Sequence, residues 1–385
     1  MRLRACPWTG PSADDFDVPR AQAAAANPDG DPKDQPGPGI VLPDGQSCLF
    51  LDGSVEVASQ SSRLWASNGA FAPALLGFTS TWQNTVDFNV ETYNRTAIGD
   101  VTTRLELSAQ TGQAEQVKAA WLQISNVVLG NRTSFYDVWT ADEFTFHAFA
   151  PNQSTNMIAG VFNMSDATTL VVSLEDPLYR RATVSGYGPS GVPDLVARTH
   201  SYLGNWQLVL SAGTHVTPLQ AGPLVASTAS IFGAASQASL RHALKNDADQ
   251  DNSYAILQIG AAYHAPGYLG INNPSSSLPI SLPGIFGASV AERANGWNGS
   301  AVVSWAWTDK LRSAGFVTFT SLNVPTANGG VTLRGTRSAA NLTYDPVSNI
   351  EITGEVGFST FNSTAAIIPN TRQTSFILSA KHSFP

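Results

Sequence analysis

The stretch NIEITGEVGFSTF, residues 349–361, alternates strictly between two kinds of side chain. From Ile350 to Phe358 every second residue is apolar or glycine, whereas the positions between them include Glu351 and Glu355. A strand with this period of two has one face against an apolar phase and the other against water. The apolar phase is either the core of a protein or the lipid of a membrane.

The composition of the whole chain favours lipid. Of the 385 residues, 13% are charged and 43% are hydrophobic, whereas about a quarter of the residues of a typical soluble protein are charged. No apolar run approaches the roughly 18–20 residues that a membrane helix needs. A low charge content without a helical span is expected of a chain that disperses its apolar residues by alternation.

Charge and motif content exclude several functional classes. The net charge is −8 and no basic run occurs, so we expect no nucleic acid partner. Two cysteines, Cys6 and Cys48, are too few for a disulfide scaffold or a Cys-ligated zinc site. The glycine pattern at 186–191 contains Pro189, which argues against the helix of a dinucleotide site. Residues 247–252 resemble only part of a calcium loop, which leaves weak Ca²⁺ binding open. We predict no enzyme and no bound cofactor.

The first 46 residues differ in composition from the rest of the chain. They are rich in Ala, Asp, Pro and Gly and have no sustained periodicity. The basic start is not followed by the apolar stretch of an intact signal peptide. We predict a disordered or processed segment at 1–46 and a barrel at 47–385.

From Cys48 onward the chain consists of about sixteen segments with strand patterning. Many are close to the 9–11 residues that a tilted strand needs to cross a bilayer. Two of the predicted strands, 117–128 and 132–140, are joined by a predicted turn at 129–131. We expect an all-β fold, an antiparallel up-and-down transmembrane β-barrel of about 16 strands.

The connections between these segments alternate between short and long ones. A soluble sandwich has no reason to sort its loops in this way, whereas an outer-membrane barrel has tight periplasmic turns and long external loops. Closing the sheet also removes its edge strands, whose backbone N–H and C=O groups would have no hydrogen-bond partners in lipid. The long connections are predicted at 60–83, 140–156, 176–192, 216–236 and 265–298.

The two faces of the predicted strands agree with a barrel in lipid. Apolar residues such as Leu105 and Val303 are expected to point outward, next to the inward neighbours Arg104 and Ser304. Aromatic residues gather at the short-turn ends, as an interfacial girdle requires. They are Trp206, Trp305, Trp307, Tyr344 and Phe384.

Three stretches resemble a known family. GPGIVLPDGQSCLFLDGSVEV (37–57) is similar to the N-terminal signature of alphaproteobacterial porins, with Gly37, Gly39 and Gly53 at matching positions. AAWLQISNVVLGNRTSFYDVWTADEF (119–144) resembles the family's approach to its constriction loop. ILSAKHSFP (377–385) resembles the aromatic-terminated last strand. The family usually carries a second cysteine just before Gly-x-Gly, which is missing here, although Cys6 could pair with Cys48.

This resemblance implies a homotrimeric, water-filled channel for passive diffusion of small hydrophilic solutes and ions across the bacterial outer membrane. In such porins the third loop folds inward and places carboxylates opposite basic residues of the wall, so that a transverse field acts on solutes. The predicted third loop is 140–156. The candidate constriction residues are Asp137, Asp142, Glu143, Arg95, Arg104 and Arg198.

Two other interpretations remain open. A barrel that serves as an adhesin or a structural protein would share the fold but would have a smaller or plugged lumen. A soluble β-rich binding protein would account for the strands but for neither the sorted loops nor the low charge.

Overall fold

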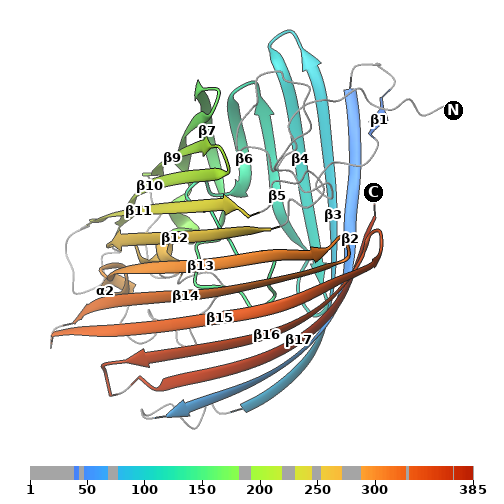
Figure 1. Cartoon of the computed structure of the whole chain (residues 1–385). Coiled ribbons are helices and arrows are strands. Elements are labelled where there is room, and N and C mark those ends of the chain that lie inside the picture. Colours follow the sequence, from blue (N-terminus) through green and yellow to red (C-terminus); the bar gives the residue numbers. More distant parts are fainter. Residues whose placement is uncertain are drawn as a thin grey trace.

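The computed structural model describes residues 39–42, 47–67, 77–181, 192–218, 230–244, 253–270, 288–326, 329–366 and 368–384. These residues form one sheet of seventeen strands (Figure 1). The strands are β1 (Ile40–Val41), β2 (Ser47–Ser67), β3 (Gly77–Thr96), β4 (Gly99–Gln110), β5 (Gln116–Ile124), β6 (Val127–Thr133), β7 (Ser154–Ser165), β8 (Thr168–Glu175), β9 (Asp194–Leu203), β10 (Trp206–Pro218), β11 (Ser230–Ala243), β12 (Tyr254–Tyr263), β13 (Asn295–Thr308), β14 (Leu311–Thr326), β15 (Gly329–Val347), β16 (Ile350–Ser363) and β17 (Asn370–Phe384).

Strands β2 to β17 close into an antiparallel barrel. Each pairs with the next along the chain, and β17 returns to β2 over the register from Asn370 opposite Ser67 to Phe384 opposite Gly53. Closure leaves the barrel without an unpaired edge. The predicted fold class, an up-and-down barrel of sixteen strands, is confirmed.

A short additional strand, β1, lies inside the predicted N-terminal segment. Ile40 pairs with Leu49 and Val41 with Cys48 of β2. Cys48 is disulfide-bonded, and its partner, like residues 1–38, lies outside the described residues.

The predicted strand at 132–140 and the predicted turn at 129–131 are wrong. The turn falls at Ser125, whose φ is 53°, so β6 begins at Val127 and ends at Thr133. Gly130 lies within β6 with a φ of 125°, and a Cβ there would meet the Ala120 carbonyl oxygen at 2.4 Å. The glycine therefore marks a close approach of two strands, not a hairpin turn.

The barrel wall is uneven in height. Strands β2 and β15 have 21 and 19 residues, whereas β6 and β8 have 7 and 8. In Figure 1 the short strands β6 to β9 form a compact wall, while β14 to β17 extend much further. The predicted loop at 60–83 overlaps these long strands, because β2 ends at Ser67 and β3 begins at Gly77.

The alternation predicted for 349–361 is confirmed. Ile352, Val356 and Phe358 are 42%, 56% and 43% exposed on the outer face, whereas Glu355 is buried inside the barrel. The aromatic residues expected beside the short turns lie there: Trp206, Trp307 and Tyr344 are exposed, and Trp305 and Phe384 are partly exposed. Among the described residues, no helix is both long enough and apolar enough to cross a membrane.

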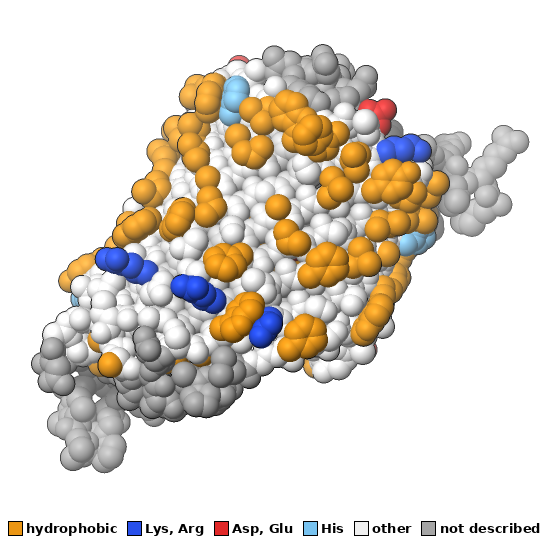
Figure 2. Space-filling view, turned by 60° about the horizontal axis from the view of Figure 1, so that its bottom comes forward, with side chains coloured by type: hydrophobic (Ala, Val, Ile, Leu, Met, Phe, Trp, Pro, Cys, Tyr) orange, Lys and Arg blue, Asp and Glu red, His pale blue; other side chains and the backbone are white. Residues whose placement is uncertain are grey.

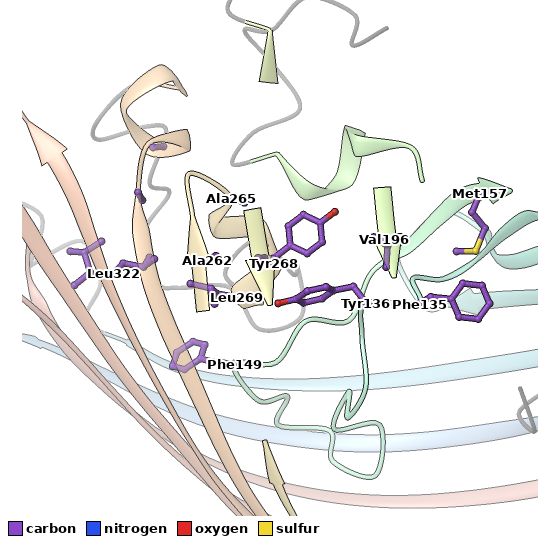
Figure 3. Packing of buried hydrophobic residues seen from close by; sticks show 14 of the residues in the cluster. Phe135, Tyr136, Phe149, Met157, Val196, Ala262, Ala265, Tyr268, Leu269 and Leu322 are labelled. Atoms are coloured by element: carbon purple, nitrogen blue, oxygen red, sulfur yellow. The ribbon is translucent and has the colours of Figure 1, made fainter. Parts of the chain in front are cut away.

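Much of the barrel interior is packed. A hydrophobic cluster joins inward side chains of β6 to β9, β11, β12 and β14 to β16 to the loops above them, and Tyr136, Val196, Tyr268 and Leu269 lie at its centre (Figure 3). The 3₁₀ helices η2 (Pro177–Arg180) and η3 (Pro266–Leu269) and the helix α2 (Ala288–Glu292) belong to these loops.

Candidate functional site

The segment between β6 and β7, residues 134–153, enters the barrel and is called the inner loop. Two carboxylates of the wall bind its amides. Glu355 of β16 accepts hydrogen bonds from the backbone N–H groups of Thr145 at 3.0 Å and Phe146 at 2.6 Å, and Glu175 of β8 accepts one from the Phe135 N–H at 3.2 Å. The loop is the third connection on its side of the barrel. The predicted position of the loop, 140–156, is therefore close, but the loop begins six residues earlier.

Two glycines of the wall make room for aromatic rings of the inner loop. A Cβ at Gly357 would lie 2.5 Å from the ring of Phe146, and one at Gly335 would lie 2.7 Å from that of Phe149. The guanidinium of Arg337, on β15 like Gly335, lies 4.1 Å from the centre of the Phe146 ring. Any larger side chain at either glycine would push the loop off the wall.

Further contacts attach the inner loop to the same side of the barrel. The Phe149 N–H donates to Thr318 Oγ1 at 3.2 Å, and the Trp139 N–H donates to Gln258 Oε1 at 3.1 Å. The ring of Phe316 packs edge-on against Phe144 with 4.7 Å between ring centres. The loop is thus fixed to β12 to β16 and leaves the facing wall free.

A cavity of about 1250 Å³ lies between the inner loop and that facing wall. Its lining is mostly polar and charged, and it includes side chains from β2 to β6, the inner loop, and the turn ends of β13 to β17. The charged residues among them are Glu56, Asp87, Arg104, Glu106, Lys118, Arg132, Asp142, Glu143, Arg312, Glu351, Glu355 and Lys381.

Basic side chains of the facing wall are interleaved with acids. Arg104 lies 2.6 Å from Glu106 and 3.5 Å from Glu91, and its side chain is only 16% exposed. Lys118 of β5 lies 2.7 Å from Asp87 of β3. Pairing holds these cations in place on the wall while they remain beside the cavity.

The inner loop contributes carboxylates to the cavity. Asp142 accepts hydrogen bonds from Thr140 and from Asn152, the latter at 2.9 Å. Glu143 accepts from the Trp139 indole at 3.0 Å and from Tyr254 at 3.1 Å. These donors are all uncharged, so the negative charge of both groups is not neutralised by them.

His147 also lines the cavity, from the inner loop. Burial lowers the pKa of its imidazole, while Asp142 opposes that shift. Because an ordinary histidine already titrates near 6.5, a lowered pKa leaves His147 neutral at pH 7. It therefore adds no positive charge beside the loop carboxylates.

Asp137 lies at the base of the inner loop, away from the cavity, and Arg198 of β9 lies next to it. Asp137 is buried, forms a 2.6 Å ion pair with Arg180, and accepts a hydrogen bond from the Gln153 N–H. Burial raises the pKa of this carboxyl, and Arg180 opposes the rise. Arg198 donates to the Asp137 carbonyl oxygen at 3.5 Å. This group connects the base of the loop to η2 and β9.

Arg95 lies at the turn between β3 and β4. Its side chain is 78% exposed and contacts Asp100 at 3.4 Å. Of the six predicted residues, the structure therefore gathers Arg104, Asp142 and Glu143 around one cavity, and places the other three elsewhere.

A second buried polar group attaches the connection between β12 and β13 to β9 and β10. His215 Nδ1 lies 3.0 Å from Asp194, and Tyr268 donates to the same carboxylate at 2.7 Å. His215 Nε2 lies 3.9 Å from Glu292 of α2. These contacts fasten η3 and α2 to the barrel wall.

Sequence reasoning missed the residues that attach the loop and some that face it. Lys118 and Arg132 were not predicted to face the loop, because the sequence around a single lysine or arginine in a strand does not indicate what lies across the lumen. Glu355 and Gly357 were placed on the inner face correctly, but the loop that covers them is 210 residues away in the chain.

Two motifs weighed in the sequence, at 186–191 and 247–252, lie outside the described residues. In the described part of the chain, no group of three or more His, Cys, Asp or Glu side chains is placed to hold a metal ion.

Comparison with known proteins shows the fold of this chain. No protein family model matches it, and no curated protein sequence is similar to it. Among solved structures, the outer membrane channel DcaP of Acinetobacter baumannii superposes with a TM-score of 0.70 and 15% identity, over 90% of this chain and 99% of that one.

Two further solved structures are similar over their whole length. The anion-selective porin from Comamonas acidovorans gives a TM-score of 0.58 at 10% identity, covering 88% of this chain and 100% of that one. The trimer form of OmpT, an outer membrane protein of Vibrio cholerae, gives 0.54 at 11%, covering 88% and 100%. The chain therefore has the porin fold.

Proposed function

We propose that this chain is a bacterial outer-membrane porin, a water-filled channel for the passive diffusion of small hydrophilic solutes and ions. One observation carries the proposal: a loop bound to one wall of a closed sixteen-strand barrel leaves a polar cavity of about 1250 Å³ beside the opposite wall. A sixteen-stranded barrel is wide enough for an aqueous channel. The similar structures include an outer membrane channel and an anion-selective porin.

The constriction in this proposal consists of Asp142 and Glu143 on the inner loop and Arg104 on the facing wall, with Lys118 and Arg132 beside it. Charges of opposite sign across a narrow aqueous gap orient dipolar solutes and discriminate between ions. Asp137 and Arg198 anchor the base of the loop, and Arg95 acts at the turn-side mouth.

Ion selectivity in a planar bilayer tests this assignment. We expect Asp142→Asn with Glu143→Gln to shift the reversal potential under a salt gradient towards anions, and Arg104→Gln to shift it towards cations. Both shifts should shrink at high salt, because the Debye length falls from about 8 Å at 0.15 M to about 3 Å at 1 M.

Asp166→Asn, at the exposed turn between β7 and β8, changes the net charge away from the cavity and serves as the control. Unchanged conductance and selectivity in the double carboxylate variant at low salt would contradict the assigned constriction. Absence of any channel activity in the wild type would favour the non-channel barrel, for which the lumen would have to be filled completely.

We further propose a homotrimer with the short wall at its centre. The 7 residues of β6 rise about 23 Å, which a tilt of about 40° reduces to roughly 18 Å. That is less than the apolar band of about 25 Å that lipid requires, so neighbouring copies would cover this wall. The trimer form of OmpT gives a precedent in the same fold. The mass of the detergent-solubilised assembly tests the stoichiometry.

The resemblance to alphaproteobacterial porins is also retained as a proposal. Two glycines that carry it have a steric role: a Cβ at Gly39 would meet the ring of Phe50 at 2.5 Å, and one at Gly53 would meet the ring of Phe384 at 2.7 Å. The same packing then explains why the signature and the terminal aromatic occur together.

A further inference from the structure

The charges of the barrel strands are divided unequally between the two faces. In the described strands, every Asp and Glu occupies a lumen-side position of the alternation. Three basic residues occupy outward positions: Arg63 on β2, Arg334 on β15 and Arg372 on β17, all exposed. Outward charges in this barrel are therefore few and of one sign.

The three arginines lie within four consecutive strands of the sheet, β15, β16, β17 and β2. Arg372 pairs with Trp65, which is two residues from Arg63 on β2. On its other side Arg372 pairs with Thr360 of β16, and Arg334 pairs with Asn362 of the same strand. Since adjacent strands lie about 4.8 Å apart, Arg334 and Arg372 are separated laterally by roughly 10 Å.

Figure 2 shows this side of the barrel. Basic side chains stand in a line beside the loop end, with hydrophobic side chains between and around them and no acidic side chain among them. The guanidinium of Arg63 lies 4.9 Å from the centre of the exposed Trp65 ring. Among the described residues, none of the three arginines forms an ion pair with a carboxylate.

The height of this line matches a membrane interface. Arg334 lies ten residues from Tyr344, the exposed aromatic residue at the turn end of β15. Ten residues rise about 33 Å along a strand, or roughly 25 Å along the barrel axis at a tilt of about 40°. The apolar band of a barrel is also about 25 Å tall. If the turn-end aromatics mark one interface, the arginines lie at the other.

We propose that Arg63, Arg334 and Arg372 form a binding surface for the phosphate headgroup of an anionic lipid in the leaflet at the loop end of the barrel. Arginine binds phosphate through two parallel N–H···O bonds. Its stem packs against the apolar band while the charged head reaches the interface. The inference rests on the membrane location proposed above.

Charge complementarity favours a lipid over a second copy of this chain. A neighbouring barrel wall would have to offer carboxylates, and the described strands hold none on their outer face. The wall that carries the arginines is also the tall one, with 19 residues in β15 and 15 in β17.

Native mass spectrometry of the detergent-solubilised protein tests this inference. The wild type should bind phosphatidic acid more tightly than phosphatidylcholine with the same acyl chains. The triple variant Arg63→Gln, Arg334→Gln, Arg372→Gln should lose roughly 100-fold in affinity for phosphatidic acid, and each single variant about fivefold, as expected for surface cations near anionic lipid. Rising NaCl should weaken wild-type binding.

The control is Lys310→Gln, at an exposed turn at the opposite end of the barrel, which should bind phosphatidic acid as the wild type does. Three results overturn the proposal. The first is equal affinity of the wild type and the triple variant for phosphatidic acid. The second is competition by inorganic phosphate at equal concentration, which would indicate a site for the free anion. The third is dissociation of the oligomer in the triple variant with lipid binding unchanged, which would indicate that a second copy of the chain binds there.

Channel conductance is measured on the same preparations. If the wild type and the variants all conduct ions but none distinguishes phosphatidic acid from phosphatidylcholine, the lipid site is refuted and the channel proposal is not. A protein that stays monodisperse without detergent would refute the membrane location and with it both proposals. The single variants keep the test valid if the triple variant does not fold.

Discussion

Two regions of the lumen occupy equivalent positions in the barrel and have opposite chemistry. In the packed region, under the loops above β7 to β12, the inward residues include Met157, Val171 and Val196, all buried. In the open region, around the cavity, they include Asp87 and Arg104. An inward-facing side chain therefore contacts water only where no loop covers it.

The difference is visible in how the two regions hold charge. Arg180 in the packed region is 2% exposed and its partner Asp137 is fully buried, whereas Lys118 and Asp87 in the open region are 49% and 29% exposed. A buried pair depends on both partners, because either one alone is an uncompensated charge. A solvated pair contributes little to stability. The packed region supports the loops, and the open region keeps charges accessible to solutes.

The largest expected effect is that of removing a buried cation. Arg180→Gln should lower the free energy of unfolding by about 3–5 kcal/mol, because Asp137 loses its ion-pair partner inside the packed region. Lys118→Gln, the matched change in the open region, should cost about 0–1 kcal/mol. Denaturant midpoints of the barrel in detergent micelles measure both. Equal costs would mean that the two regions do not differ in solvation.

A smaller effect is expected where the inner loop meets the wall. Glu355→Ala removes the acceptor of two loop amides and should cost about 1–3 kcal/mol of loop-docking free energy. Hydrogen exchange at Thr145 and Phe146 should accelerate, and single-channel current should become noisier. Glu351 lies four residues away on the same face and pairs with the half-buried Arg312, so Glu351→Gln should leave both amides protected. Unchanged exchange in the first variant would show that the other contacts of the loop hold it without Glu355.

The smallest effect is expected at the mouth of the channel. Arg95 is 78% exposed and contacts Asp100, so solvent and salt screen its charge. Arg95→Gln should leave the unfolding midpoint unchanged and shift the reversal potential less than Arg104→Gln does. A shift of equal size would place Arg95 at the narrowest point and extend the open region to the turn.

The strands of the packed region have a second sequence signature besides alternation, namely uninterrupted apolar runs. MIAGVF (157–162) and LVV (170–172) are apolar without interruption, as expected of strands covered on both faces. In β16, by contrast, polar residues alternate with the apolar ones, because the lumen face of this strand contacts water or the amides of the inner loop. They are Glu351, Thr353 and Glu355. Runs and alternation together therefore predict which strands are covered.

The sequence by itself determined the barrel. Period-two alternation, the low charge and the sorted turns are local properties of each strand, and closure follows because lipid cannot satisfy a free sheet edge. It also determined which face of β16 is polar, and that Arg104 points inward.

Only the tertiary structure decided where the inner loop lies and which charged side chains remain in contact with water. The bond between Glu355 and Phe146 spans 209 residues of sequence, and that between Trp139 and Gln258 spans 119. The same kind of residue, an aspartate of the inner loop, became a buried partner of Arg180 at Asp137 and a cavity-lining group at Asp142. Neighbours in sequence do not carry that information, because the packing of distant strands and loops decides how much water reaches each side chain.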